Sequence, residues 1–215
     1  MTDPDAWARE AEDRVLDKAL ELAATMGWTR LTVRAAARAC GMSAADAELL
    51  APNGPADLAA LLARRHDARA LAALADVDAQ ALKIRARIRR AVEARLDAVA
   101  ADEAAATRRW AGFLALPHRL PLALKLLWDS ADRLWRWAGD TATDENHYSK
   151  RAILAGILAG ATAIELQGGR AAAMAFVDAR IENVMAFETW KATTKLRPQD
   201  ALRDVAAALG KLRYG

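Results

Sequence analysis

The amino-acid sequence predicts an all-α protein of about nine or ten helices. Ala and Leu dominate a chain whose residues are 54% hydrophobic, and both are strong helix formers. Apolar residues recur at three- and four-residue spacing almost throughout, and no alternating β pattern of useful length occurs. With 215 residues, the chain can form one ordinary globular domain, or one domain with a small appended module.

The first elements follow from their start and stop signals. The first helix is expected to end at Gly27, Thr32 to cap the second helix, and Gly41 to end it. Ser43 starts a short third helix, and the Pro-Asn-Gly-Pro stretch at 52–55 forms a turn. A fourth helix is therefore expected from about residue 56.

The later elements are longer. Residues 78–101 are expected to form an amphipathic helix, whose basic side chains indicate a solvated face in preference to a nucleic-acid contact. Helical segments broken at Pro117 and Pro121 follow, and then a capped helix that stops at residues 168–169, Gly-Gly. The last long helix is expected over residues 170–191.

Composition narrows the class of protein. A net charge of +3 is too small to indicate a nucleic-acid binder, and Cys40, as the only cysteine, excludes an internal disulfide. The acidic, polar N-terminal stretch is neither a secretory signal nor an Arg-rich transit peptide. The longest uncharged apolar run, residues 152–164, is too short to span a bilayer. We therefore expect a cytoplasmic protein, at most peripheral on the inner face of the membrane.

Residues 19–43 resemble the helix-turn-helix of TetR-type regulators. Gly27-Trp28 ends the first helix, Thr-Val-Arg follows at 32–34, and Ala-Arg-Ala-Cys-Gly-Met-Ser occupies 37–43. The resemblance implies a TetR-like fold, with a three-helix unit at 1–62 and a larger helical domain at 63–195.

The segment that would read DNA departs from this pattern. Residues 44–51 contain no amide side chain, arginine or aromatic, and Asp46 and Glu48 would meet DNA phosphates with negative charge. No nucleic-acid partner is therefore expected. A ligand-responsive TetR-type regulator remains the alternative function, and it would have to bind DNA through another surface, such as the basic 83–95 helix.

Signals for catalysis are weak. The three histidines form no His-x-x-x-His or Glu-x-x-His pair, no serine lies in a Gly-x-Ser-x-Gly elbow, and there is no Gly-rich phosphate loop. We expect no enzyme activity, no metal and no cofactor, although an enzyme on a helical scaffold is a third interpretation.

The most distinctive pattern lies in residues 116–157. It contains Leu-Pro, then Ala-Asp-x-x-Trp-x-x-Ala-Gly-Asp, and then Asp-x-Asn-x-Tyr-x-x-Arg. The matching residues are Leu116, Pro117, Ala131, Asp132, Trp135, Ala138, Gly139, Asp140, Asp144, Asn146, Tyr148 and Arg151. This pattern resembles the Coq-nine family of accessory proteins in coenzyme Q (ubiquinone) biosynthesis, with weaker agreement to about residue 187.

The resemblance implies a TetR-like fold that no longer binds DNA. Its interior would hold isoprenoid lipid, and the protein would present quinone intermediates to a ubiquinone-pathway ring hydroxylase. In some members of the family, the partner surface includes an aromatic residue just before the Tyr of the last motif, where this chain has His147.

Three apolar helix faces are candidates for the lipid site. Packing into a solid core is the general interpretation of such faces, and the resemblance favours a lipid pocket instead. The predicted lipid-binding residues are Leu127, Trp128, Ala131, Leu134, Trp135, Ile153, Ile157, Leu158, Ala161, Met174, Val177, Ile181 and Met185.

Polar and aromatic residues between two of these helices form the predicted partner surface. Asp144 also suits a helix N-cap, whereas Tyr and Arg are favoured anchors of protein interfaces. The predicted partner-binding residues are Asp140, Asp144, Asn146, His147, Tyr148 and Arg151.

Residues 196–215 are predicted to form a C-terminal amphipathic helix. Its apolar residues, Leu202, Val205, Leu209 and Leu212, either pack on the domain or contact a membrane. A homodimer is expected, because TetR-like folds usually pair through their last long helices.

Overall fold

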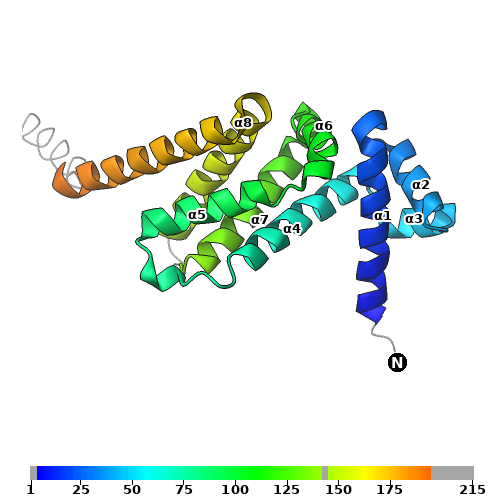
Figure 1. Cartoon of the computed structure of the whole chain (residues 1–215), viewed down its shortest axis with the longest axis horizontal. Coiled ribbons are helices and arrows are strands. Elements are labelled where there is room, and N and C mark those ends of the chain that lie inside the picture. Colours follow the sequence, from blue (N-terminus) through cyan, green and yellow to red (C-terminus); the bar gives the residue numbers. More distant parts are fainter. Residues whose placement is uncertain (1–3, 142–144, 195–215) are drawn as a thin grey trace, which may run out of the picture. The chain divides into compact units, whose positions relative to one another are not determined.

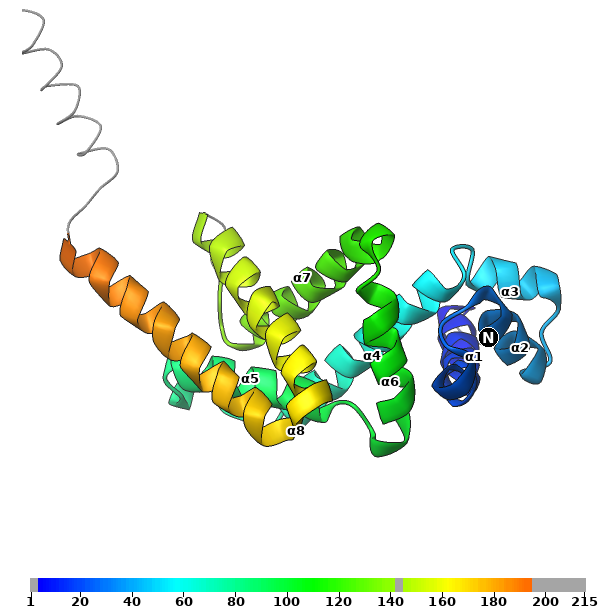
Figure 2. The ribbon, with the colours of Figure 1, turned by 90° about the horizontal axis from the view of Figure 1, so that it is seen from above.

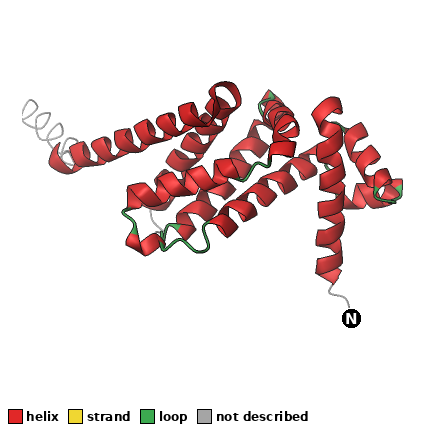
Figure 3. Ribbon diagram, viewed as in Figure 1, coloured by secondary structure: helices red, strands yellow, loops and turns green. Residues whose placement is uncertain are grey.

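The computed structural model describes residues 4–141 and 145–194, and over these ranges the chain is helical with no strand (Figure 3). The all-α prediction is confirmed, and the finer TetR-like arrangement stays a prediction. The elements in chain order are α1 (Pro4–Met26), α2 (Arg30–Ala39), α3 (Ala44–Leu50), α4 (Pro55–Ala73), η1 (Ala79–Ala81), α5 (Ile84–Asp97), η2 (Ala101–Glu103), α6 (Ala104–Leu114), η3 (Pro117–Arg119), α7 (Leu120–Trp137) and α8 (Glu145–Thr194).

The chain divides into two compact units, residues 1–177 and 178–215, and each is described by itself. In the first unit, α1, α2 and α3 lie together, and α4 leads from them to α5 and α7, which pack beside it (Figure 1). The boundary predicted at residue 62 lies inside α4, which is continuous from Pro55 to Ala73. The division at 62 and 195 stays a prediction, and the predicted third part, 196–215, lies outside the described residues.

One apolar core joins α1, α2, α4 and α6. Two buried tryptophans anchor it: the Nε1 of Trp28 donates to the carbonyl of Ala106, and the Nε1 of Trp110 donates to the carbonyl of Ala59, both at 3.0 Å. A buried indole therefore keeps its hydrogen bond while its ring contributes apolar area. These bonds fasten α6 to α4 and to the turn between α1 and α2, which are distant from it in sequence.

The start of α2 differs from the sequence prediction. The N-cap is Thr29, whose hydroxyl accepts from the backbone N–H of Thr32, and helix α2 begins at Arg30. Thr32, predicted as the cap, is buried in the first turn, and its Oγ1 donates to the carbonyl of Gly27 at 2.7 Å. The prediction was wrong because two threonines lie within one helical turn, and spacing alone does not say which one leaves the helix.

The start of α3 confirms Ser43 as its N-cap. The Ser43 hydroxyl accepts from the backbone N–H of Asp46, and the Asp46 carboxylate accepts from the backbone N–H of Ser43 at 3.0 Å, which completes a capping box. Hydrogen bonds from the side chain and backbone of Ser43 lower the pKa of Asp46. Asp46 is thus a structural residue of α3, in addition to being a charge that disfavours DNA.

Two other boundaries differ from the prediction. Asp78, expected within a long helix, instead caps the short η1, and α5 begins at Ile84 and ends at Asp97. At the other end of the chain, Gly169 has φ 79° and breaks the helical path of α8, as the Gly-Gly stop predicts, but helix continues on both sides of it.

Polar groups buried on α4 connect it to three neighbouring helices. His66 is fully buried, and its Nε2 lies 3.2 Å from the Oε2 of Glu103, at the start of α6. Asp67 accepts from the Nε of Arg95 on α5 and from the hydroxyl of Ser130 on α7, both at 2.7 Å. Buried polar groups that are bonded in this way fix the angles at which helices pack.

Helix α8 is long and apolar enough over Asn146–Phe187 to cross a membrane, by length and composition alone. The apolar run at 152–164 is therefore part of a longer apolar helix than the sequence run suggested. One face of α8 nevertheless buries Leu154, Leu158 and Ala161 within the first unit. Only 22% of the most apolar stretch of this segment is buried.

Candidate functional site

The end of α7 and the start of α8 bring the distinctive sequence motifs together. Helix α7 ends in a Schellman turn, in which the N–H of Asp140 donates to the carbonyl of Trp135 and the N–H of Gly139 donates to the carbonyl of Arg136, both at 3.0 Å. Gly139 has φ 87°, which L side chains rarely adopt. The Ala-Gly-Asp motif is thus the helix stop that delivers Asp140 to the site.

Helix α5 and the segment before it lie against this turn. The Nη1 of Arg87 donates to the carbonyl of Ala138 at 2.8 Å, and a Cβ at Gly139 would lie 2.8 Å from the Nε2 of Gln80. The backbone conformation therefore favours glycine at position 139, and a Cβ there would also make the end of the flexible Gln80 side chain shift.

Arg151 lies at the centre of an ion-pair network, which we call the Arg151 network: Asp132, Arg136, Asp140, Lys150 and Arg151. The Arg151 side chain is 2% exposed, and it donates from Nε to Asp132 at 2.9 Å and from Nη1 to Asp140 at 2.5 Å. Lys150 binds the other oxygen of Asp140, and Arg136 binds the other oxygen of Asp132. The network joins the end of α7 to the start of α8.

The network also sets the charge states of its carboxylates. Burial by itself would raise the pKa of Asp140, but hydrogen bonds from Lys150 and Arg151 outweigh it and hold that pKa below its usual range. Burial likewise opposes ionisation of Asp132, and the hydrogen bonds from Arg151 and Arg136 lower its pKa. Burial opposes the charge of Arg151 too, but the two carboxylates raise its pKa. All three groups are ionised at neutral pH.

An aromatic cluster of Trp128, His147 and Tyr148 covers the adjacent surface. The rings of His147 and Tyr148 meet edge to face with centroids 5.2 Å apart, and Trp128 lies 6.4 Å from His147 and 6.1 Å from Tyr148. The Tyr148 side chain remains 64% exposed. The first turn of α8 thus presents rings outward while Arg151, one turn further on, points into the chain.

Trp135 adds a second link between the two helices. Its Nε1 donates to the carbonyl of Lys150 at 3.0 Å, and the Nζ of Lys150 lies 5.5 Å from its ring centroid. The motif tryptophan and the motif arginine therefore fasten α8 to α7 at neighbouring points, where the two helices cross (Figure 2).

Comparison with known proteins agrees with this use of the motifs. Residues 120–188 match the COQ9 family. This chain carries a COQ9 domain. The resemblance to the Coq-nine family that the sequence predicts is confirmed.

Three relatives show how far the similarity extends. The ubiquinone biosynthesis protein COQ9, mitochondrial, of Bos taurus is 33% identical over 155 residues, which cover 69% of this chain and 48% of the relative. The Homo sapiens protein of that name is 30% identical over 158 residues, with the same coverage. COQ9-A of Xenopus laevis is 48% identical over 46 residues, 21% of this chain and 14% of the relative. The chain spans about half the length of the first two relatives. All three are named as mitochondrial, so the comparisons do not support the predicted cytoplasmic location.

The structure separates the predicted partner-binding residues of the COQ9 domain into two groups. Arg151 is buried, and the Asp140 carboxylate is enclosed between Lys150 and Arg151, so both act within the fold. Asn146 and Tyr148 are exposed and His147 is half-buried, so they form the accessible part of the set. Asp144 lies outside the described residues.

The predicted lipid-binding residues are more buried than accessible. Ala131, Leu134, Ile157, Leu158, Ala161, Met174 and Val177 are buried, Leu127, Trp128 and Trp135 are half-buried, and Ile153 is exposed. Ile181, half-buried, and Met185, exposed, belong to the second unit. The predicted membrane residues Leu202, Val205, Leu209 and Leu212 lie outside the described residues. Gly160, expected to allow close approach of another helix, lies against the Phe176 ring of the same chain.

A pocket of about 210 Å³ lies elsewhere in the first unit. It is lined by Arg69, Ala73, Ala94, Asp97, Ala98 and Ala100, none of which belongs to the predicted lipid set. Seven residues of the predicted set are buried, so an isoprenoid chain would have to displace side-chain contacts to reach them.

Sequence reasoning left three residues of the Arg151 network, Asp132, Arg136 and Lys150, out of the predicted site. Asp132 was part of the matched motif, and its spacing of four from Arg136 is a signal for a helical ion pair. Lys150 gave no such signal, because its partner Asp140 lies across the turn between two helices. A pairing of that kind depends on how α8 folds back on α7.

Proposed function

We propose that this chain acts in ubiquinone biosynthesis as a non-enzymatic lipid-binding accessory protein. It binds isoprenoid quinone intermediates and presents them to a ring hydroxylase. The COQ9 match over residues 120–188 carries the proposal, since the matched relatives are named ubiquinone biosynthesis proteins. Those names give no support to the alternative of a transcriptional regulator.

The chemistry of the site supports an accessory role. Its ionisable side chains neutralise one another, because Arg151 and Lys150 occupy the carboxylates of Asp132 and Asp140. A catalytic acid or base needs a proton-transfer atom that can reach substrate, and these atoms are engaged in holding two helices together. Among the described residues, no group of three or more His, Cys, Asp or Glu side chains is placed to hold a metal ion.

We place the lipid along the seam between α7 and the first half of α8. Leu127, Trp128 and Trp135 are half-buried there, and Ile153 is exposed. Partly accessible apolar side chains of this kind give an isoprenoid chain a place to begin displacing the packing beneath. The small side chains at Ala131 and Ala161 reduce the volume that has to move.

The aromatic cluster is the proposed docking surface for the hydroxylase. Tyr and Trp are favoured interface anchors because they bury large area at low entropic cost. The cluster adjoins the proposed lipid seam, since Trp128 belongs to both. A docked hydroxylase would therefore meet the lipid where it leaves the seam. A homodimer stays part of the proposal, and sedimentation of the purified chain tests it.

The test is the identity of lipid bound to the full chain. The chain is purified from a host that makes ubiquinone, and its organic extract is analysed by mass spectrometry for isoprenoid quinone intermediates. We expect such lipid in the wild type and roughly tenfold less in Leu127→Trp, since the added volume fills the seam. Leu49→Trp is the matched control, because Leu49 lies on α3, away from α7.

Two results would contradict the proposal. In the first, the purified wild-type protein contains no isoprenoid lipid, which rules out a lipid-carrier role. In the second, Leu127→Trp and Leu49→Trp contain equal amounts of lipid, which shows that the lipid does not bind at the α7–α8 seam.

A further inference from the structure

The apolar face of α7 is covered over only half its length. In the C-terminal half, Ala131, Leu134 and Ala138 are buried, and this half is hydrogen-bonded to α8 through Asp132, which accepts, and Trp135, which donates. In the N-terminal half, Leu120 is 48% exposed and Leu124 is 66% exposed. At 100° per residue, both leucines lie on the same side of the helix as Ala131. The chain thus continues an apolar face beyond the segment that its own helices cover.

Leu116, just before η3, is exposed as well. Leu116, Leu120 and Leu124 follow one another at four-residue intervals, and we call these three leucines the α7 leucine row. Two of the row's neighbours are exposed prolines, at positions 117 and 121. Exposed apolar residues gathered in this way mark a surface that contacts another apolar phase.

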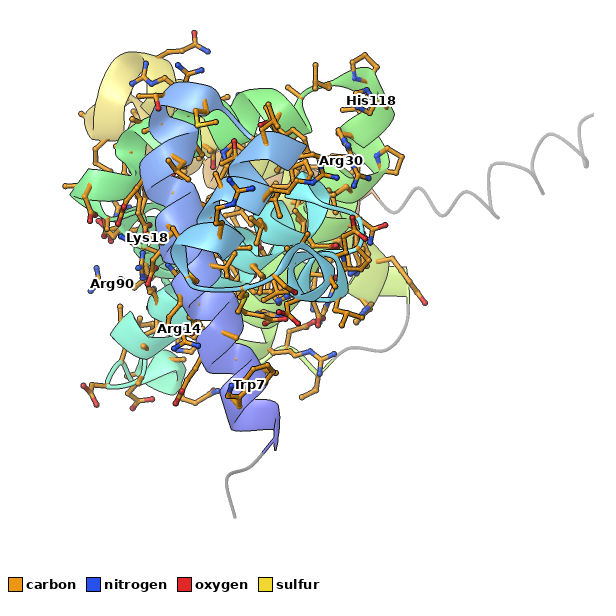
Figure 4. The ribbon with its side chains drawn as sticks, turned by 90° about the vertical axis from the view of Figure 1, so that its right-hand side faces the viewer. Trp7, Arg14, Lys18, Arg30, Arg90 and His118 are labelled. Atoms are coloured by element: carbon orange, nitrogen blue, oxygen red, sulfur yellow. The ribbon has the colours of Figure 1, made fainter. Side chains whose placement is uncertain are left out.

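The segment that contains the row has an excess of positive charge. Residues 104–128 contain four cations, at positions 108, 109, 119 and 125, and no Asp or Glu. Arg119 is held over the Phe113 ring at 4.9 Å, and Lys125 is exposed beside Leu124, paired with Asp129 in the next turn. His118 lies at the outer edge of the molecule (Figure 4).

We propose that the α7 leucine row contacts the surface of a bilayer that contains anionic phospholipid. Leucines that enter the acyl boundary, with Lys and Arg at headgroup level, are the pattern of an interfacial helix. The absence of acidic residues over 104–128 matches a negative surface. A protein partner that carries both acidic and basic residues would not explain why Asp and Glu are absent from residues 104–128.

This contact differs from the one expected of residues 196–215, and it rests on described residues of α7 alone. It rests on the proposed function and orients the proposed lipid seam relative to the bilayer. Trp128 is one turn beyond Leu124 on the same helix, so the bilayer contact brings the aromatic cluster close to the headgroups. The lipid seam then opens at the depth where a membrane-dissolved quinone intermediate is found.

Flotation of the full chain with vesicles tests the proposal. The vesicles are pure phosphatidylcholine or phosphatidylcholine mixed with phosphatidylglycerol. We expect flotation with the mixed vesicles that weakens in high salt. The double variant Leu120→Glu, Leu124→Glu should bind roughly tenfold more weakly or worse, because two leucines lose their apolar contact.

A matched control is available on α2 and α3. Leu31 and Leu49 are 66% and 82% exposed, so Leu31→Glu, Leu49→Glu makes the same change of charge and apolarity outside the row. It should float like the wild type. Circular dichroism of both variants checks that the helices are intact.

Three outcomes would overturn the proposal. In the first, the wild type does not float with either vesicle. In the second, the α7 variant floats as the wild type does, while Leu202→Glu, Leu209→Glu does not, which assigns the contact to the C-terminal residues. In the third, the α7 variant turns a dimer into a monomer without changing flotation, which assigns the row to a second copy of the chain. Isoprenoid lipid measured in the same samples keeps a failure here distinct from a failure of the proposed function.

Discussion

Arg151 is enclosed by the chain, and two carboxylates from the other side of a turn hold its charge. An ion pair of this kind is not strong evidence for stability, because both partners lose their hydration. Removing Arg151 alone is costly, since the two carboxylates lose the buried cation that joins them and keep one partner each, Lys150 and Arg136. Four motif residues, Asp132, Gly139, Asp140 and Arg151, are therefore explained by one junction between two helices.

We predict that Arg151→Met lowers the free energy of unfolding by about 3–5 kcal/mol, because Asp132 and Asp140 lose their shared cation. Urea unfolding followed by circular dichroism measures this. Arg136→Met is the control: Arg136 also binds Asp132 but is 70% exposed, so its loss should cost less than about 1 kcal/mol.

If both variants lower the free energy of unfolding by a similar amount, the ion pairs of Arg151 are worth no more than an exposed surface pair. Adding Asp140→Asn to Arg151→Met should recover part of the stability, because a neutral amide costs less to bury than a carboxylate that keeps only Lys150 as its partner. That second variant keeps the prediction testable if Arg151→Met does not fold.

At the scale of elements, α4 is held by buried polar groups as well as by its apolar face. His66 on α4 faces Glu103 at the start of α6 and meets Trp110 edge to face, with ring centroids 6.3 Å apart. Burial, and after it the charge of Arg95, lower the pKa of His66 to about 4, although the hydrogen bond to Glu103 opposes both. The imidazole is therefore neutral in the folded protein at neutral pH.

This depressed pKa predicts a loss of stability in mild acid. The unfolded chain takes up a proton at His66 near pH 6.5, whereas the folded chain does so only near pH 4. Stability therefore falls as the pH drops below 6.5, by about 1.4 kcal/mol between pH 7.5 and 5.5. Urea unfolding at the two pH values measures it.

His66→Gln should remove most of this pH dependence. His118→Gln should keep it, because His118 is exposed on η3. An unchanged slope in His66→Gln would assign the pH dependence to other groups.

The helices of the N-terminal unit show how far local signals extend. Gly27, Gly41 and Ser43 mark helix ends where the sequence places them, because each acts through its own backbone geometry or a bond to a near neighbour. The cap of α2 was assigned to Thr32 instead of Thr29, and the start of α5 was placed six residues early. The first error arose because two threonines lie within one helical turn, and the second because Asp78 caps the short η1 while α5 begins after Lys83 without a side-chain cap.

At the scale of the whole molecule, one surface of the COQ9 domain carries the proposed partner contact. We predict that Tyr148→Ala weakens binding to a ubiquinone-pathway hydroxylase roughly 30-fold, the effect of an interface anchor worth about 2 kcal/mol. Titration calorimetry with the purified hydroxylase measures it. The unfolding midpoint should not change, because Tyr148 is 64% exposed.

Leu49→Ala is the control for this experiment, since it removes an exposed apolar side chain on α3. Equal affinity of wild type and Tyr148→Ala would move the interface away from the aromatic cluster. A large change in the unfolding midpoint of Tyr148→Ala would instead assign Tyr148 a structural role.

The sequence by itself determined the helical fold class, the segment without DNA-reading residues and the motifs of the COQ9 domain. These features depend on residues near one another along the chain, where helix periodicity and capping act. Only the tertiary structure decided that Arg151 and Asp140 face inward, that Tyr148 faces outward and that half of the α7 apolar face is uncovered. Those outcomes depend on where α8 crosses α7, and the turn between the two helices leaves no periodic signal in the sequence.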